Sequence, residues 1–361
     1  MVPYPLGRAP SQRYRLEQWA PHLRERGVEL DFAPFQDEET FRLLWEPGAP
    51  SSAKARRLLG CVAARVALLG RLDAFDVVIL HREALSFGPA LIERLVARRR
   101  PLVFDFDDAI WLPSANAANP LAPHLKFQGK TRAIVARARA VMAGNDYLAS
   151  WARRYCADVE VVPTTIELAH MYSRTRIHGP REVPVIGWTG TDTTLPYLEE
   201  LAPALRTLAA RRRFRLRVIT GTRTPRLEGL DVEVVRWSAE REVDDLLALD
   251  LGLMPQPDAP WTRGKCGMKA LQYMALGIPP VGSRNGMLLA LIDDGENGAL
   301  AAGPAEWVSQ LERLLDDWSL RARLGLAARR TVETRYAASI VAPRVVDVLA
   351  RAMARSRASG E

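Results

Sequence analysis

Two lysines lie four residues apart in the segment RGKCGMKALQYMALGIPPVGSRNG, residues 263–286. The chain has 50 lysines and arginines, and only five of them are lysines, at positions 54, 126, 130, 265 and 269. A cation in this chain is therefore almost always an arginine, and two lysines so close together indicate a particular use. Lysine provides a compact point charge that suits a phosphate group.

We expect a helix to begin near Cys266 and to end at Gly277, which places residues 265, 269 and 272 on one stripe. The free N–H groups at a helix start favour an anion, and glycine lets a ligand approach the backbone closely. The segment thus predicts a diphosphate site formed by Lys265, Gly267, Lys269 and Gln272. The alternative is a solvated helix face on which the lysines are incidental.

Two further loops are candidates for the same anion. The turn in IGWTGTDTT, residues 186–194, offers Gly187, Thr189, Gly190 and Thr191 between an apolar run and a helical one. This arrangement can cradle phosphate, although its residues also suit a helix cap. The loop YPLGRAPSQRYR, residues 4–15, offers Gly7 and Arg13. The alternative there is that Ser11 caps a helix and the arginines are solvated.

Polar side chains also follow three apolar runs in the first half of the chain. His81 and Arg82 follow DVVIL, the segment DFDDAIW carries Asp105, Asp107 and Asp108, and Asn145 follows AVMAG, with Asp146 as the expected helix N-cap. Because ligands bind outside the carboxyl ends of strands in α/β folds, we predict catalytic roles for His81, Asp107 and Asp108. Arg82 and Asn145 are predicted to contact a second substrate.

The three aspartates leave other roles open: a metal site, a general base, a ligand for a substrate hydroxyl or a helix cap. No second carboxylate cluster or histidine pair accompanies them in the sequence. We therefore predict no metal site.

Short apolar runs alternate with amphipathic ones, which is typical of parallel sheets covered by helices on both faces. We expect strands at 28–34, 76–80, 101–107, 140–144 and 159–163, and then at 183–190, 214–221, 232–237, 250–255 and 278–283. These elements predict two doubly wound α/β domains, 1–168 and 169–335, that face each other across a ligand cleft. Only Met1 and Val2 precede the first loop, so either the first strand is stunted or the start of the chain is assigned too late, and we favour the second.

The composition narrows the class of protein. Hydrophobic residues make up 48% and charged residues 25% of the 361 residues, as in ordinary globular proteins. The sequence has no apolar run of spanning length and no signal peptide. The three distant cysteines fit neither a disulfide framework nor a metal site and suggest a cytoplasmic protein. The net charge of +8 suggests an anionic partner, although much of the arginine lies at predicted helix ends.

The motifs together resemble the retaining family-4 glycosyltransferases of GT-B fold, the glycosyl transferases group 1. The resemblance covers nearly the whole chain and rests on APSQRYRLEQWAPHLRERGVEL, DVVILHRE, AVMAGNDYLASWARRY and VEVVPTTIEL in the first half. In the second half it rests on IGWTGT, LGLMPQ, KALQYMALGIPPVGS and IDDGENGALA. It implies a nucleotide-diphosphate-sugar donor bound by the second domain, an acceptor bound mainly by the first, and a C-terminal helix, 336–361, that packs back onto the first domain. It also implies retention, no cofactor, and a leaving phosphate that helps to take the acceptor proton.

The chain departs from the family pattern at several positions. The usual pair of glutamates is replaced by Gly264 and Gln272, and the usual Arg/Lys pair after IGWTGT is missing. Lys265 and Lys269 are the cations available to replace that pair. Met287, Leu288 and Leu289 replace common polar donor contacts, so the identity of the donor cannot be carried over from the family.

Three other functions stay open. A GT-B sugar-nucleotide epimerase would need carboxylate acid/base pairs, which DFDD could provide. Loss of the glutamates also suits a non-catalytic nucleotide-sugar-binding scaffold. Nucleic-acid binding is suggested by charge alone, and we predict no specific nucleic-acid partner. The resemblance implies a cytoplasmic enzyme of cell-envelope polysaccharide synthesis that works on lipid-linked acceptors, and the arginine-rich segments 52–72 and 88–100 then predict weak peripheral contact with the membrane. The alternative for 52–72 is an ordinary core-facing helix.

Overall fold

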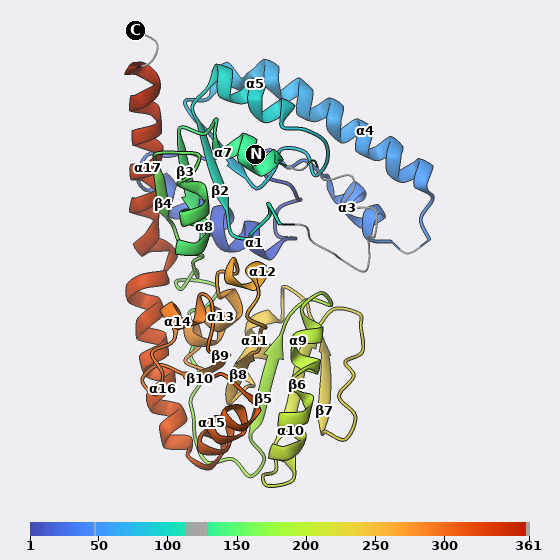
Figure 1. Ribbon diagram of the computed structural model, residues 1–361, viewed down its shortest axis with the longest axis vertical. Helices are drawn as coiled ribbons and strands as arrows, with labels where there is room; N and C mark the ends of the chain where they lie inside the picture. Colours follow the sequence, from blue (N-terminus) through green and yellow to red (C-terminus); the bar gives the residue numbers. More distant parts are fainter. Residues whose placement is uncertain (47, 113–126, 128, 359–361) are drawn as a thin grey trace. The chain divides into compact units, whose positions relative to one another are not determined.

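The structure is a computed structural model that describes residues 1–46, 48–112, 127 and 129–358 (Figure 1). The chain forms two compact units. The first comprises Met1–Thr164 together with Val341–Glu361, and the second comprises Thr165–Ile340. Among the described residues, none of the helices combines the length and the apolar content that a membrane span needs.

The first unit contains a parallel sheet of four strands in the order β1-β2-β3-β4. The strands are β1 (Val78–His81), β2 (Leu102–Phe106), β3 (Ala140–Ala143) and β4 (Val159–Val161). The first three are buried along their whole length, which explains their continuous apolar sequences. His81 pairs with Asp105 at the carboxyl ends of β1 and β2.

The prediction of a strand at 28–34 is wrong. In this segment only Pro34 forms a bridge, to Val2. Met1 donates to the Ile79 carbonyl and accepts from the His81 N–H, so Met1 and Val2 lie between β1 and residues 33–35. A partner of two residues cannot support a longer ladder, and the preceding residues stay irregular.

The helices of the first unit surround this sheet. They are α1 (Pro10–Gln12), a π-helical turn (Arg13–Glu17), α2 (Gln18–Arg24), α3 (Glu38–Trp45), α4 (Ser51–Leu68) with a 3-10 extension (Leu69–Ala74), α5 (Leu91–Arg99), α7 (Lys130–Val135) and α8 (Asp146–Ala152). The C-terminal helix α17 (Ala338–Ala358) packs on this unit, where Arg351 and Arg355 form ion pairs with Asp158 next to β4.

The second unit contains a parallel sheet of six strands in the order β10-β9-β8-β5-β6-β7. The strands are β5 (Val185–Thr189), β6 (Arg215–Thr220), β7 (Val232–Arg236), β8 (Leu251–Met254), β9 (Pro280–Ser283) and β10 (Ala299–Ala301). The last was not predicted, since its three residues follow the turn at 294–298 too closely to show a pattern. Both units thus have the predicted doubly wound α/β architecture.

The helices of the second unit are α9 (Leu195–Glu199), α10 (Ala202–Ala209), α11 (Glu242–Leu247), α12 (Pro260–Arg263), α13 (Met268–Ala275), α14 (Leu288–Leu291), α15 (Pro304–Asp316), α16 (Trp318–Thr331) and a π-helical turn (Val332–Tyr336). Apolar side chains of α9, α10 and α15 pack on the sheet around Trp188 and Leu216. This packing fixes the carboxyl end of β5, where the predicted phosphate-binding turn begins.

Candidate functional site

The turn after β5 and the start of α13 meet in the second unit. Lys269 donates from its Nζ to Thr194 Oγ1 over 3.0 Å, and its Nζ lies 4.7 Å from the centre of the Trp188 ring. Thr194 Oγ1 donates in turn to the Thr191 carbonyl, and the Thr191 and Thr193 hydroxyls are 2.7 Å apart. The structure therefore brings together two loops that the sequence proposed independently.

Lys269 carries an unusually labile proton. Burial, followed by the nearby Lys265 cation, lowers the pKa of the Lys269 ammonium to about 7. In the described part of the chain, no carboxylate forms an ion pair with Lys269 that would oppose this effect. An anionic ligand would supply the missing negative charge.

Lys265 is not on the same helix as Lys269, contrary to the expectation from the sequence. Gly267 has a φ of 73°, in the left-handed region that suits glycine, and α13 begins only at Met268. Lys265 lies in the preceding link, where its Nζ is 5.0 Å from the Trp261 ring centre. The two lysines approach the site from different segments, while Gly267 caps the first turn of α13.

Thr189 and Gly190 are held in place by buried aromatic side chains. The Thr189 N–H donates to the Tyr273 hydroxyl over 2.9 Å, and Tyr273 in turn donates to the Leu253 carbonyl. A Cβ added at Gly190 would lie 2.5 Å from the Trp188 ring, so only glycine fits there without displacing the indole. These contacts fix the backbone at the end of β5.

Two residues predicted for this site lie elsewhere. Gly187 is inside β5, and a Cβ added there would lie 2.2 Å from Leu249, so its small size serves packing. Gln272 is 2% exposed and donates to the Tyr172 hydroxyl over 2.8 Å, on the inner side of α13. With α13 starting at Met268, the expected stripe of residues 265, 269 and 272 does not exist.

In the first unit, His81 belongs to a fully buried polar cluster. Its Nδ1 lies 2.6 Å from Asp105 Oδ2, and Arg15 donates to both oxygens of Asp105. Burial alone would raise the pKa of Asp105, but the Arg15 cation and the hydrogen bonds from His81 and Arg15 lower it. Asp105 is therefore a carboxylate that orients the imidazole.

Arg82 and the two other aspartates form a second cluster at the same sheet edge. Arg82 Nη2 lies 2.9 Å from Asp107 Oδ1 and 2.5 Å from Asp108 Oδ2. Burial is the largest effect and would raise the pKa of Asp107, but the neighbouring cations, Arg82 foremost, and the hydrogen bond from Arg82 together bring it to about 2. Arg82 has a φ of 61°, which a residue with a side chain seldom adopts, and such strain concentrates at functional sites.

The remaining candidates of the first unit have local structural contacts. Asn145, and not Asp146 as expected, is the N-cap of α8, because its side chain accepts from the Leu148 N–H over 2.9 Å. Gly7 lies in an exposed turn and donates its N–H to Glu17. Arg13 is 6% exposed and its guanidinium lies over the Tyr14 ring.

Sequence reasoning missed Trp188, Thr194 and Tyr273 in the second unit, and it proposed Arg15 for an anionic ligand, whereas Arg15 pairs with the buried Asp105. The sequence gives no clear signal for Trp188 and Tyr273, because an aromatic residue in a buried strand or helix usually belongs to the core. The Nε1 of Trp188 is buried and has no hydrogen-bond partner among the described residues. The unpaired N–H of Trp188 and the adjacent Lys269 ammonium distinguish the carboxyl end of β5 from an ordinary hydrophobic core.

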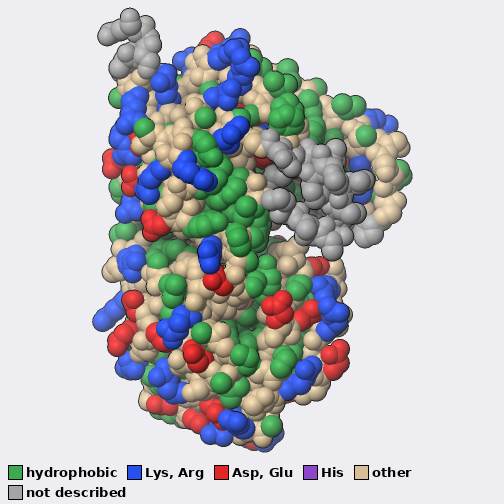
Figure 2. All heavy atoms as spheres, viewed as in Figure 1, with side chains coloured by type: hydrophobic (Ala, Val, Ile, Leu, Met, Phe, Trp, Pro, Cys, Tyr) green, Lys and Arg blue, Asp and Glu red, His purple; other side chains and the backbone are tan. Residues whose placement is uncertain are grey.

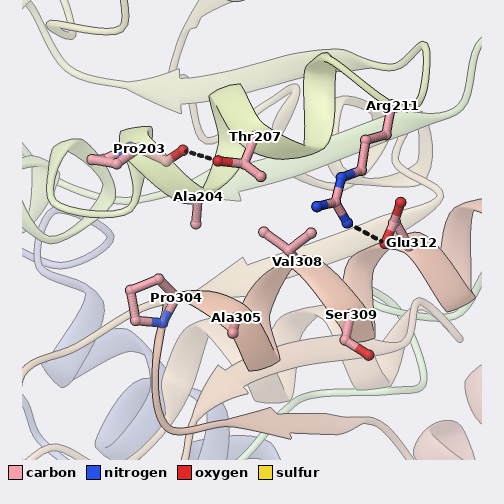
Figure 3. A pocket seen from close by; sticks show the side chains of 9 residues that line it. All are labelled: Pro203, Ala204, Thr207, Arg211, Pro304, Ala305, Val308, Ser309 and Glu312. Carbon is pink, nitrogen blue, oxygen red and sulfur yellow. Dashed lines mark hydrogen bonds and ion pairs between the residues drawn. The ribbon is translucent and has the colours of Figure 1, made fainter.

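A groove with a volume of about 310 Å³ lies between α10 and α15, away from these residues (Figure 3). Small side chains on the facing helices, Ala204 and Ala305, leave the space, and the ion pair between Arg211 and Glu312 closes one end. None of the predicted site residues lines this groove.

Residues 184–317 match the family model described as glycosyl transferases group 1. The D-inositol 3-phosphate glycosyltransferase of Corynebacterium kroppenstedtii is 35% identical over 103 residues, which are 27% of this chain and 22% of that protein. The protein of the same name from Corynebacterium diphtheriae is 42% identical over 64 residues, or 17% of this chain. The matched stretches thus span less than a quarter of these relatives.

Several solved structures match nearly the whole chain, among them the following two. Sucrose-phosphate synthase from Thermosynechococcus elongatus has a TM-score of 0.71 at 14% identity and covers 95% of this chain and 94% of its own. Anabaena HepE, solved with UDP and glucose, has a TM-score of 0.68 at 14% identity and covers 97% and 98%. Residues 184–317 are therefore similar to the glycosyl transferases group 1, and the chain has the GT-B fold of these two solved structures.

Proposed function

We propose that the protein transfers a sugar from a nucleotide-diphosphate sugar to a hydroxyl acceptor, with retention of configuration at the anomeric carbon. The second unit holds the donor and the first unit mainly holds the acceptor. The observation that supports this proposal most directly is the meeting of Lys269 with the threonine-rich turn after β5. The family match of the second unit and the UDP and glucose in the HepE structure agree with it.

The chemistry that the second unit can supply is electrostatic. Lys265, together with Lys269 once a bound anion restores its charged form, places positive charge at the start of α13. Such charges stabilise the diphosphate as it leaves, when its negative charge is greatest. In the proposed mechanism the leaving phosphate also takes the proton of the attacking acceptor hydroxyl, and the lysines replace a divalent metal as the source of positive charge.

The contacts of Asp107 bear on the alternative epimerase function. An epimerase needs a group that donates and accepts protons near neutral pH. The pKa of Asp107 is about 2, below its usual range, because the neighbouring cations, Arg82 foremost, and the Arg82 hydrogen bond together outweigh the effect of burial. Asp107 is thus suited to hold Arg82 or a substrate hydroxyl, and the glycosyltransferase proposal is the better fit.

The membrane proposal concerns the helices α4 and α5 of the first unit. They expose Leu59, Val66, Leu91 and Leu95, with Leu59 70% exposed. Figure 2 shows basic side chains among the hydrophobic ones in this region. We propose weak peripheral attachment to an anionic, cytoplasmic membrane face. Co-sedimentation with vesicles rich in phosphatidylglycerol should occur at low salt and fall in the variant L59E/V66E, and its absence at low salt would contradict the proposal.

The first experiment is a donor screen with UDP-, GDP-, dTDP- and ADP-sugars, by calorimetry and by release of nucleoside diphosphate, with and without EDTA. D-inositol 3-phosphate and simple glycosides serve as acceptors. One donor should bind and turn over regardless of EDTA, and product NMR should show a retained anomeric configuration. Binding without turnover with any acceptor would favour the scaffold alternative.

The lysine pair is tested in the same assay. The variant K265A/K269A should lose at least roughly tenfold in donor affinity, since a hydrogen bond to a charged group contributes about 1.5–3 kcal/mol. Lys54→Ala, on α4, is the matched control and should bind like the wild type. Unchanged affinity in the double variant would refute the assignment of the diphosphate site.

A further inference from the structure

The buried cluster around His81 ends in a hydroxyl at the surface. Ser11 in α1 is partly exposed, and its Oγ lies 3.3 Å from His81 Nε2, while His81 itself is 0% exposed. Both imidazole nitrogens are therefore engaged within the protein, Nδ1 by Asp105 and Nε2 by Ser11. Of these side chains, Ser11 is the one that a ligand can reach.

The cluster also determines the direction of the hydrogen bonds. Asp105 is held by Arg15 and accepts hydrogen bonds only, so the His81 Nδ1 carries a proton. In the neutral imidazole the Nε2 is then an acceptor, and Ser11 directs its hydroxyl proton to it. The lone pairs of Ser11 Oγ remain for a donor from outside.

The surroundings indicate what that donor is. Arg82 directly follows His81 and forms ion pairs with Asp107 and Asp108. Ser11 therefore lies at the carboxyl edge of β1 and β2, where α/β folds bind ligands. Because Ser11 Oγ can only accept a further hydrogen bond, it selects a ligand that carries an O–H group at this position.

We propose that Ser11 accepts a hydrogen bond from an acceptor hydroxyl that does not itself react, and that His81, Asp105 and Arg15 are positioning residues for Ser11. The inference rests on the proposed function. It changes the role of His81 from a catalytic group to one that acts through Ser11. It also makes Ser11 a specificity-determining residue, because an acceptor without that hydroxyl would leave the Ser11 oxygen unsatisfied.

The alternative is that the cluster only stabilises the first unit. A double-mutant cycle separates the two roles, with kcat/KM for the acceptor measured by release of nucleoside diphosphate and folding followed by thermal unfolding. Ser11→Ala should lower kcat/KM for the acceptor roughly tenfold at unchanged donor affinity. Ser11→Thr keeps the hydroxyl and should retain most activity, and Ser52→Ala, an exposed serine on α4, should match the wild type.

The variant H81N should also lower kcat/KM, but S11A/H81N should lose no more than S11A, because His81 acts through the hydroxyl already removed. Full activity in folded S11A, or additive losses in the double variant, would overturn the inference while leaving the glycosyltransferase activity established. If the wild type turns over no nucleotide sugar, the proposed function fails and this inference fails with it. Deoxy analogues of the acceptor should identify the hydroxyl that Ser11 contacts. Removal of that hydroxyl should lower the activity of the wild type and leave the activity of S11A unchanged.

Discussion

The ammonium group of Lys269 lies 4.7 Å from the centre of the Trp188 ring. The indole face attracts a cation, and Thr194 accepts a hydrogen bond from it. Neither contact replaces the water that burial removes, and Lys265 adds a repelling charge, so the pKa of Lys269 falls to about 7. The site is thus prepared for an anion, whose binding would restore the charged form of Lys269.

This relationship predicts proton uptake on binding. In the free protein Lys269 is largely neutral above pH 7, and a bound diphosphate raises its pKa, so binding takes up about one proton. The affinity for the nucleoside diphosphate of the identified donor should fall as pH rises from 7 to 9, by up to about tenfold per pH unit. Calorimetry at several pH values, in buffers of different ionisation enthalpy, measures both quantities.

The variant K269M is the control for that measurement. Above pH 7 the ligand phosphate is already ionised and cannot itself cause the change. K269M should therefore bind weakly with no proton uptake and with a flat pH dependence. Proton uptake that persists in K269M would assign the effect to another group.

Lys269 should also lower the stability of the free protein. Its pKa of about 7 in the folded state is below the usual 10.5, so the unfolded chain binds more protons between these values, and stability rises with pH across that range. K269M removes the burial of charge and should be more stable than the wild type at pH 6, on the order of 1 kcal/mol. Thermal unfolding at pH 6 and pH 9 should show the advantage shrinking at the higher pH. Lower stability of K269M at both pH values would mean that the contacts to Trp188 and Thr194 outweigh the cost of burial.

The sequence predicted the sheets well, because buried parallel strands leave continuous apolar runs and their polar ends mark one edge. That rule placed His81 and Asp105 at the ends of two strands, which the structure pairs with each other, and it placed the Thr189–Thr191 turn at the end of β5. It could not show which side chains point inward. Gln272 points inward to Tyr172, a partner that lies 100 residues away in the sequence and that no local pattern reveals.

Gly187 illustrates the same limit and yields a prediction of its own. A glycine in a strand signals either a close ligand or a close side chain, and here Leu249 occupies the space. Gly187→Ala should destabilise the fold by about 1–3 kcal/mol through overpacking. Leu249→Ala alone should cost about 2–5 kcal/mol, and the double variant should be more stable than the sum of the two losses implies. Chemical denaturation measures this coupling. Donor affinity in the folded double variant should equal that of the wild type, and a clear loss would restore the ligand role of Gly187.

The ion pairs of Arg82 predict a characteristic behaviour in acid. Asp107 has a pKa of about 2 in the folded state against an ordinary 3.8, because the neighbouring cations, Arg82 foremost, together with the Arg82 hydrogen bond outweigh the effect of burial. A depressed carboxyl pKa contributes stability that is present above pH 4 and is lost as the pH falls towards 2. The contribution is roughly 2 kcal/mol from the size of the shift. D107N should therefore be less stable than the wild type at pH 6, and the difference should shrink towards pH 3 in urea denaturation.

The control for D107N is D73N, because Asp73 also pairs with an arginine but its side chain is 80% exposed. An exposed pair contributes about 0–1 kcal/mol, so D73N should differ little from the wild type at any pH.

The lowered pKa of Asp107 also constrains catalysis, because a carboxylate with a pKa of about 2 cannot serve as a general acid near neutrality. Asp107 should therefore contribute no ionisation above pH 4 to the pH profile of kcat/KM, and D107N should leave the shape of the profile above pH 4 unchanged. A limb near pH 6 that disappears in D107N would show that substrate binding breaks the Arg82 pair and frees Asp107 for proton transfer, which would revive the epimerase alternative.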